Sequence, residues 1–147
     1  MPSFITRSPH LITNGPIIAV RIVLDAYTRK SLEQASKPIP APITFSALID
    51  TGASITYISP RVSSQFNLVP RGVSQILTGG SPVLSNLYDI GIDIGVHFRR
   101  NIIFDPIRVA EAPLVGQTNI DCLLGRDILS MGVFIYIGYD GSFSFSI

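Results

Sequence analysis

The chain has 147 residues, which is enough for one domain that buries its own hydrophobic core. Hydrophobic residues make up 46% and charged residues 14%, a balance that excludes a disordered chain and favours an oligomer. The net charge of +1, without a long basic run, provides no stripe for tracking phosphates, so nucleic acid is not expected as a partner.

β-Strands are the elements that the sequence predicts most clearly. Segments rich in Ile, Val, Phe and Leu and bounded by Gly, Pro, Asn or Asp have the composition of strands. We expect them, in chain order, at residues 17–24, 43–49, 83–94, 102–107 and 133–137. Tyr139-Asp140-Gly141-Ser142 predicts a tight hairpin turn into a last strand at residues 143–147, because Asp-Gly tolerates positive φ angles. The fold class is therefore mainly β, closed or barrel-like, in a single domain over residues 1–147.

Helices and long connections are few in this prediction. One short helix is expected at residues 126–131, ended by Gly132 in a left-handed conformation. Residues 26–42, which hold three prolines and four charges, and residues 109–119 are expected as exposed loops. Residues 46–52 and 120–126 resemble each other, since each is an apolar strand that runs into a glycine turn.

Cys122 is the single cysteine and lies in an apolar run, so we expect a small buried thiol and a reducing compartment. The start of the chain lacks the pattern of a signal peptide and no membrane span is seen, which favours a cytoplasmic location. His10 and His97 lie far apart with no cysteine cluster, so a zinc site is not expected. A nucleophile pair of Cys122 with a histidine is an alternative, but the apolar flanks argue against it.

Asp50 occupies an unusual place for a charge, where the apolar strand at residues 43–49 ends in a glycine turn. Apolar residues continue after the turn at Ile55, Tyr57 and Ile58. Apolar surroundings disfavour an ionised carboxylate, and enzymes use such groups as acids or bases. The alternative is a carboxylate that only accepts hydrogen bonds from its own turn, since Asp and Gly are ordinary turn formers.

The sequence Asp50-Thr51-Gly52-Ala53 resembles the Asp-Thr-Gly-Ala signature of the retropepsin family, the retroviral-type aspartic proteases and their cellular and bacterial relatives. Leu123-Leu124-Gly125-Arg126, followed by a short helix, resembles the second motif of that family in order and spacing. Residues 76–81 are placed like its flap hairpin. The resemblance implies a closed β-barrel with a flap hairpin and one short C-terminal helix.

The same resemblance implies roles for individual residues. Asp50 would be the catalytic carboxylate, and Thr51 and Gly52 would support its turn. Residues of the floor and the flap would contact substrate: Ala53, Ser54, Ile76, Leu77, Thr78, Gly79, Gly80 and Leu124. Leu123, Gly125 and Arg126 would form the structural second motif. The resemblance implies neither a metal nor a cofactor.

A metal-free aspartic protease needs two carboxylates that share one proton, and this chain has a single Asp-Thr-Gly. A homodimer in which Asp50 meets its symmetry mate would supply the pair. The expected function is a homodimeric aspartic endopeptidase that cleaves extended polypeptides with apolar residues at the cut. The alternatives are a catalytically silent dimer that binds peptides, and a β-barrel subunit with no site.

One position departs from the family pattern. Retroviral members often carry an aspartate after Asp-Thr-Gly-Ala, which pairs with the arginine of the second motif, and here this residue is Ser54. We therefore expect Arg126 to take another partner, Asp121 or Asp127.

Overall fold

The computed structural model describes residues 2–78, 80–98, 101–114, 116 and 119–147. These residues form two β-sheets, with four α-helices and one 3-10 helix at Val96–Phe98. The strands are β1 (Ser3–Arg7), β2 (Ile17–Leu24), β3 (Ile43–Ile49), β4 (Tyr57–Ile58), β5 (Gly72–Thr78), β6 (Ser81–Asp93), β7 (Ile103–Glu111), β8 (Cys122–Leu124), β9 (Val133–Ile137) and β10 (Ser142–Ser146). The helices are α1 (Leu11–Asn14), α2 (Ala26–Gln34), α3 (Pro60–Gln65) and α4 (Arg126–Leu129). The mainly β prediction is confirmed.

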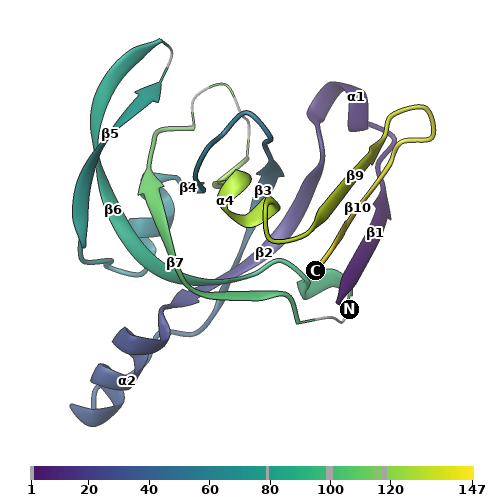
Figure 1. Cartoon of the computed structure of the whole chain (residues 1–147). Coiled ribbons are helices and arrows are strands. Elements are labelled where there is room, and N and C mark those ends of the chain that lie inside the picture. Colours follow the sequence, from purple (N-terminus) through teal and green to yellow (C-terminus); the bar gives the residue numbers. More distant parts are fainter. Residues whose placement is uncertain (1, 79, 99–100, 115, 117–118) are drawn as a thin grey trace.

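The larger sheet has the order β2-β3-β8-β4-β7-β6-β5, and β2 also pairs with β6. Alternate residues of these strands point inward, as the period of a strand requires. Ile22 lies opposite Ile92 and Leu24 opposite Ile90, and all four side chains are buried. The sheet wraps round the main apolar core, and β5 extends from its edge with β6 as a hairpin (Figure 1).

The two segments that resemble each other in the sequence lie side by side in the structure. β3 and β8 run parallel, with Ala47 opposite Cys122 and Ile49 opposite Leu124. Both strands end in their glycine turns at the same edge of the sheet. This pairing brings the Asp50 turn against the turn at Gly125.

The second sheet joins the two ends of the chain in the order β1-β10-β9. Phe4, Phe143 and Phe145 point from it into the core, and the Phe4 and Phe143 rings meet edge to face at 6.4 Å. The predicted hairpin turn is confirmed, with Gly141 at φ 73°. Gly132 lacks the left-handed conformation expected of it. A Cβ there would lie 2.2 Å from the Ser146 carbonyl oxygen, so close backbone approach is what requires glycine.

Two expectations about helices and loops are wrong. Residues 26–34 form α2 instead of an exposed loop, and the C-terminal helix α4 is one of four α-helices in the described chain. α2 has no fully buried residue and projects from the body of the molecule (Figure 1). Leu32 packs only partly against the core, so no apolar periodicity marks this helix in the sequence. The sequence does carry a signal for the start of α2, because Asp is a preferred residue before a helix. Asp25 caps α2 by accepting from the Thr28 backbone amide at 3.0 Å.

The prediction of a loop at residues 109–119 is also wrong about where the loop begins. β7 continues to Glu111, past the end predicted at residue 107, because Val109 and Ala110 pair with β6 and are fully buried. None of the described helices is long and apolar enough to cross a membrane.

The cap of α2 can be tested by mutation. Asp25 is buried and accepts both the amide and the hydroxyl of Thr28. We expect Asp25→Ala to lower the free energy of unfolding by about 1–2 kcal/mol, and Asp25→Asn, which keeps an acceptor, to lower it less. Urea unfolding at matched protein concentration measures both. Equal stability of the alanine variant and the wild type would show that α2 does not depend on this cap.

Candidate active site

Asp50 lies directly after β3, in a turn that its own carboxylate helps to close. The Gly52 amide donates to Asp50 Oδ1 at 2.8 Å, and the Ala53 amide donates to the Asp50 carbonyl at 3.2 Å. Asp50 is half-buried, whereas Thr51 and Gly52 are exposed. The turn therefore presents one carboxylate at the surface and fixes its direction.

The glycine turn at Gly125 is hydrogen bonded to the Asp50 turn. The Asp50 amide donates to the Leu124 carbonyl at 3.0 Å, and the Arg126 amide donates to the Ala53 carbonyl at 2.9 Å. A Cβ on Gly125 would lie 2.4 Å from the Ile55 backbone, so only glycine allows this approach. The second motif thus acts as a backbone clamp on the turn that carries Asp50.

A buried hydrogen-bond network locks this clamp. Thr56 is fully buried, and its hydroxyl donates to Asp127 Oδ1 at 2.8 Å while it accepts from the Gly125 amide at 3.2 Å. The Thr56 amide donates to the other Asp127 oxygen at 2.8 Å. One carboxylate on α4 and one hydroxyl therefore join the strand after the Asp50 turn to the second motif. Nothing in the sequence motif drew attention to Thr56.

The two acids that were expected to pair with Arg126 are engaged elsewhere. Asp127 is held by Thr56, and Asp121 accepts from Ser59 and from Arg61 Nη1 at 2.8 Å. Arg126 Nη1 instead donates to the Thr51 carbonyl at 2.7 Å. The expectation of an Asp121 or Asp127 partner is therefore wrong, because Thr56 holds Asp127 while Ser59 and Arg61 hold Asp121.

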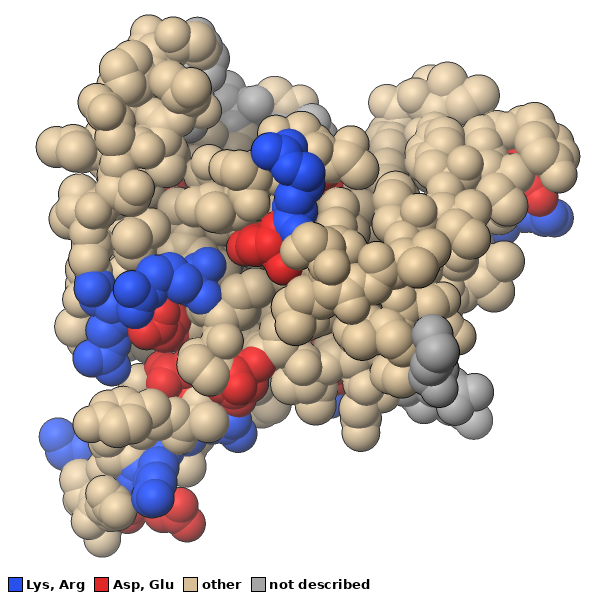
Figure 2. Space-filling view, viewed as in Figure 1, with Lys and Arg blue, Asp and Glu red and all other residues tan. Residues whose placement is uncertain are grey.

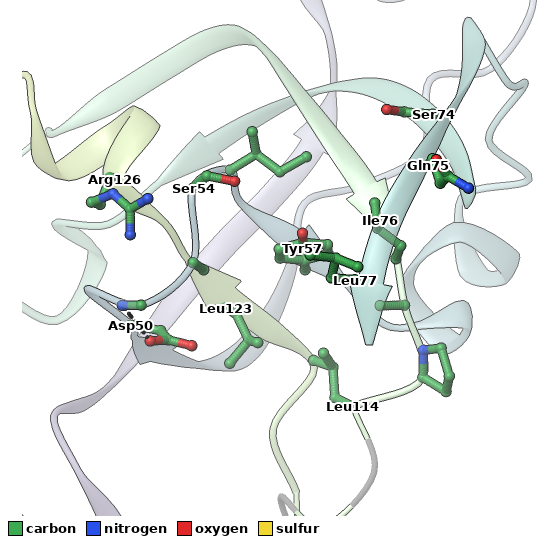
Figure 3. A pocket seen from close by; sticks show the side chains of 15 residues that line it. Asp50, Ser54, Tyr57, Ser74, Gln75, Ile76, Leu77, Leu114, Leu123 and Arg126 are labelled. Atoms are coloured by element: carbon green, nitrogen blue, oxygen red, sulfur yellow. Dashed lines mark hydrogen bonds between the residues drawn. The ribbon is translucent and has the colours of Figure 1, made fainter. Parts of the chain in front are cut away.

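Asp50 borders a groove of about 700 Å³ between its turn and the β5–β6 hairpin. In Figure 3, Asp50 and Arg126 lie on one side of this groove, and Ile76, Leu77 and Leu114 lie on the other. Most of the lining residues are apolar by type, and Asp50 and Arg126 are the only charged ones in the described chain. Asp50 also borders a second hollow, of about 600 Å³, near α1.

The groove gathers four of the eight expected substrate-binding residues: Ala53, Ser54, Ile76 and Leu77. Asp50 and Gly52 of the expected catalytic turn and Leu123 and Arg126 of the expected second motif also line it. Leu124 does not, because it points into the core and is fully buried, and Leu123 lines the groove instead. Gly80 lies at the exposed end of the hairpin with φ 85°. Gly79 and the side chains of Thr78 and His97 lie outside the described residues.

Several groove residues were missed in the sequence. Ile55 and Tyr57 follow the Asp50 turn and were noted only as apolar, and Ser74 and Gln75 directly precede the expected flap residues on β5. Residues 112–114 come from the segment expected as a loop. Only the return of the chain after β7 brings them near Asp50, so no local pattern marks them.

Cys122 is a buried thiol, as expected. Burial raises its pKa, and the nearby Asp127 and Asp121 carboxylates raise it further. A thiol in this state is a poor nucleophile at neutral pH. The geometry therefore gives no support to cysteine chemistry at this position.

Some of the surface charges are paired. The described chain holds four ion pairs: Arg7–Asp140, Arg29–Asp105, Arg61–Asp121 and Arg108–Asp89. Arg108 donates two hydrogen bonds to Asp89 and thereby lowers the pKa of that carboxyl. On the face in Figure 2, basic and acidic groups accordingly lie next to one another in an otherwise uncharged surface.

The Thr56 network can be tested by removing one hydroxyl. Thr56→Val keeps the shape but leaves the Gly125 amide without its acceptor, so we expect the free energy of unfolding to fall by about 1–3 kcal/mol. Thr56→Ser keeps the hydroxyl and serves as the matched control. Denaturant unfolding of the three proteins checks this, and a valine variant as stable as the serine variant would contradict it.

Comparison with known proteins gives the fold a name. No protein-family model matches the sequence, and no curated protein matches it. A retropepsin-like aspartic protease from Rickettsia conorii is similar in structure at 15% sequence identity and a TM-score of 0.57, covering 97% of this chain and 89% of that one. The retroviral protease-like domain of Ddi1 from Leishmania major is 12% identical, with a TM-score of 0.46, covering 84% and 82%. The chain has a retropepsin-like fold.

Proposed function

We propose that the protein is a homodimeric aspartic endopeptidase that cleaves extended polypeptides. The observation that carries the proposal is the placement of Asp50. Its carboxylate is half-buried, fixed by the Gly52 amide, and lies at the edge of a groove that is otherwise mostly apolar. A retropepsin-like fold with this carboxylate at its Asp-Thr-Gly turn supports the assignment.

The other acids support the choice of Asp50 by what they do. Asp25 caps α2, and Asp127 holds Thr56. Four further acids are in ion pairs: Asp89, Asp105, Asp121 and Asp140. Asp50 is the acid that lines the large groove in the described chain, and it makes no ion pair there. A second carboxylate for the reaction must therefore come from another copy.

A twofold axis beside Asp50 would bring two such carboxylates together. Like charges at close range cannot both ionise, so the pair would share one proton. The ionised carboxylate would take a proton from a water molecule as that water attacks the peptide carbonyl, and the protonated one would donate to the carbonyl oxygen. The half-buried position of Asp50 between two hollows leaves room for this approach.

The shape of the groove favours an extended peptide. Its two walls are the Asp50 turn and the β5–β6 hairpin, and the backbone of an extended chain can hydrogen bond to both. Apolar side chains from both walls, among them Tyr57, Ile76 and Leu123, would take large apolar residues beside the cut. Thr51, exposed at the turn, would meet the partner's turn across the axis. A cytoplasmic setting suits the buried, unpaired thiol.

The second candidate is a silent dimer that binds peptides without cutting them. The groove alone fits either function. The fixed direction of the Asp50 carboxylate favours the enzyme, because the reaction needs a base held in one position and peptide binding alone does not.

Asp50→Asn separates the two candidates. The amide is nearly the same size but cannot act as the base, so we expect proteolysis to be lost while thermal midpoint and dimer dissociation constant change little. The assay is cleavage of a mixed peptide library, with Asp25→Asn as a control outside the groove. Undiminished cleavage by a folded Asp50→Asn protein would overturn the mechanism.

Dilution tests the shared site. Because each subunit contributes one carboxylate, specific activity should fall as the protein is diluted through its dimer dissociation constant. Sedimentation and cleavage rates are measured on the same dilution series. A monomer that cleaves at an undiminished specific rate would contradict the homodimer.

A further inference from the structure

Among the described residues, Arg126 is the one cation that lines the groove, and it forms no ion pair with them. All ten acidic residues belong to the described chain, and no carboxylate among them lies within 4.0 Å of Arg126. Its side chain is exposed and gives a single hydrogen bond to the described chain, from Nη1 to the Thr51 carbonyl. A guanidinium has five N–H donors in a planar fork that matches a carboxylate.

The position of this cation relates it to a bound peptide. Arg126 borders the groove on the Asp50 side, as Ser54 does, and the serine hydroxyl carries no charge that would neutralise it (Figure 3). The hydrogen bond to Thr51 anchors one nitrogen of the guanidinium, so the charge is held in place. Holding the fork reduces the entropy lost when it binds an anion.

We propose that Arg126 determines substrate specificity by binding an acidic side chain of the peptide. This inference rests on the proposed function and names its substrate class: peptides with apolar residues at the cut and a Glu or Asp that reaches the Ser54 side of the groove. Successive side chains of an extended peptide point to opposite walls. The preference therefore falls on alternate positions that face the Asp50 wall.

The homodimer adds a second constraint. A twofold axis beside Asp50 places one Arg126 on each side of the scissile bond. The preference for an acid should therefore occur at two positions, one before and one after the cut. A preference on one side only would contradict this symmetric placement of Arg126.

The experiment uses quenched fluorescent peptides that differ at one position, where Glu is compared with Gln. For the wild-type dimer we expect kcat/KM for the Glu peptide to exceed that for the Gln peptide by about tenfold at the preferred positions. The ratio should fall toward one in Arg126→Gln and as the ionic strength is raised. Arg7→Gln, which removes an exposed arginine paired with Asp140 on the terminal sheet, is the matched control and should keep the ratio.

Ser54→Asp provides a second variant. A carboxylate beside Arg126 would compete for the guanidinium, so the Glu to Gln ratio should also fall toward one. The ratio is independent of the absolute rate, so a loss of activity through the Thr51 contact does not obscure it. A wild-type ratio near one at every position would overturn the proposal even if cleavage is rapid.

A binding arm separates this proposal from the proposed function. Fluorescence anisotropy with labelled Glu and Gln peptides and the Asp50→Asn dimer measures affinity without cleavage. A Glu preference that disappears in the Asp50→Asn, Arg126→Gln double variant supports Arg126, even if the wild type proves to be a silent binder. Cleavage without any acidic preference in either assay would support the proposed endopeptidase and contradict the proposed role of Arg126.

Discussion

The Asp50 amide donates to the Leu124 carbonyl where β3 and β8 run parallel, and the geometry of the site depends on this contact. A parallel pair brings two strand ends to the same edge of a sheet, so two turns far apart in the sequence face each other there. Because Gly125 has no Cβ, the Ile55 backbone can lie 2.4 Å from the point that a Cβ would occupy. The resulting clamp fixes a carboxylate at the surface without covering it.

The groove has walls of different construction. The Asp50 wall is backed by the core and by the buried Thr56 to Asp127 network. The other wall is a hairpin that buries Ile76 but leaves Leu77 and Leu84 75% exposed. A site that needs a fixed catalytic group and an adaptable cover would distribute its contacts in this way, because local opening costs least where few apolar side chains are buried.

Two side chains, Asp50 and Arg126, give the groove its charge in the described chain. Elsewhere most of the carboxylates cap a helix, accept hydrogen bonds from hydroxyls or amides, or pair with arginines. Asp50 and Arg126 are left in the groove without ion-pair partners in the described chain. Ser54, which lines the same groove, carries no charge that could neutralise Arg126.

The sequence by itself determined the mainly β fold, the strands with strong apolar runs, the terminal hairpin turn and Asp50 as the candidate carboxylate, because each of these depends on local chemistry or on a short motif. It missed α2, which buries no residue and so leaves no apolar periodicity. Only the tertiary structure decided that Leu123 lines the groove while Leu124 enters the core, since neighbouring residues of a strand point to opposite faces. Only it showed that Asp121 and Asp127 are taken by Arg61 and Thr56, because the contacts of a carboxylate depend on which distant segments fold beside it.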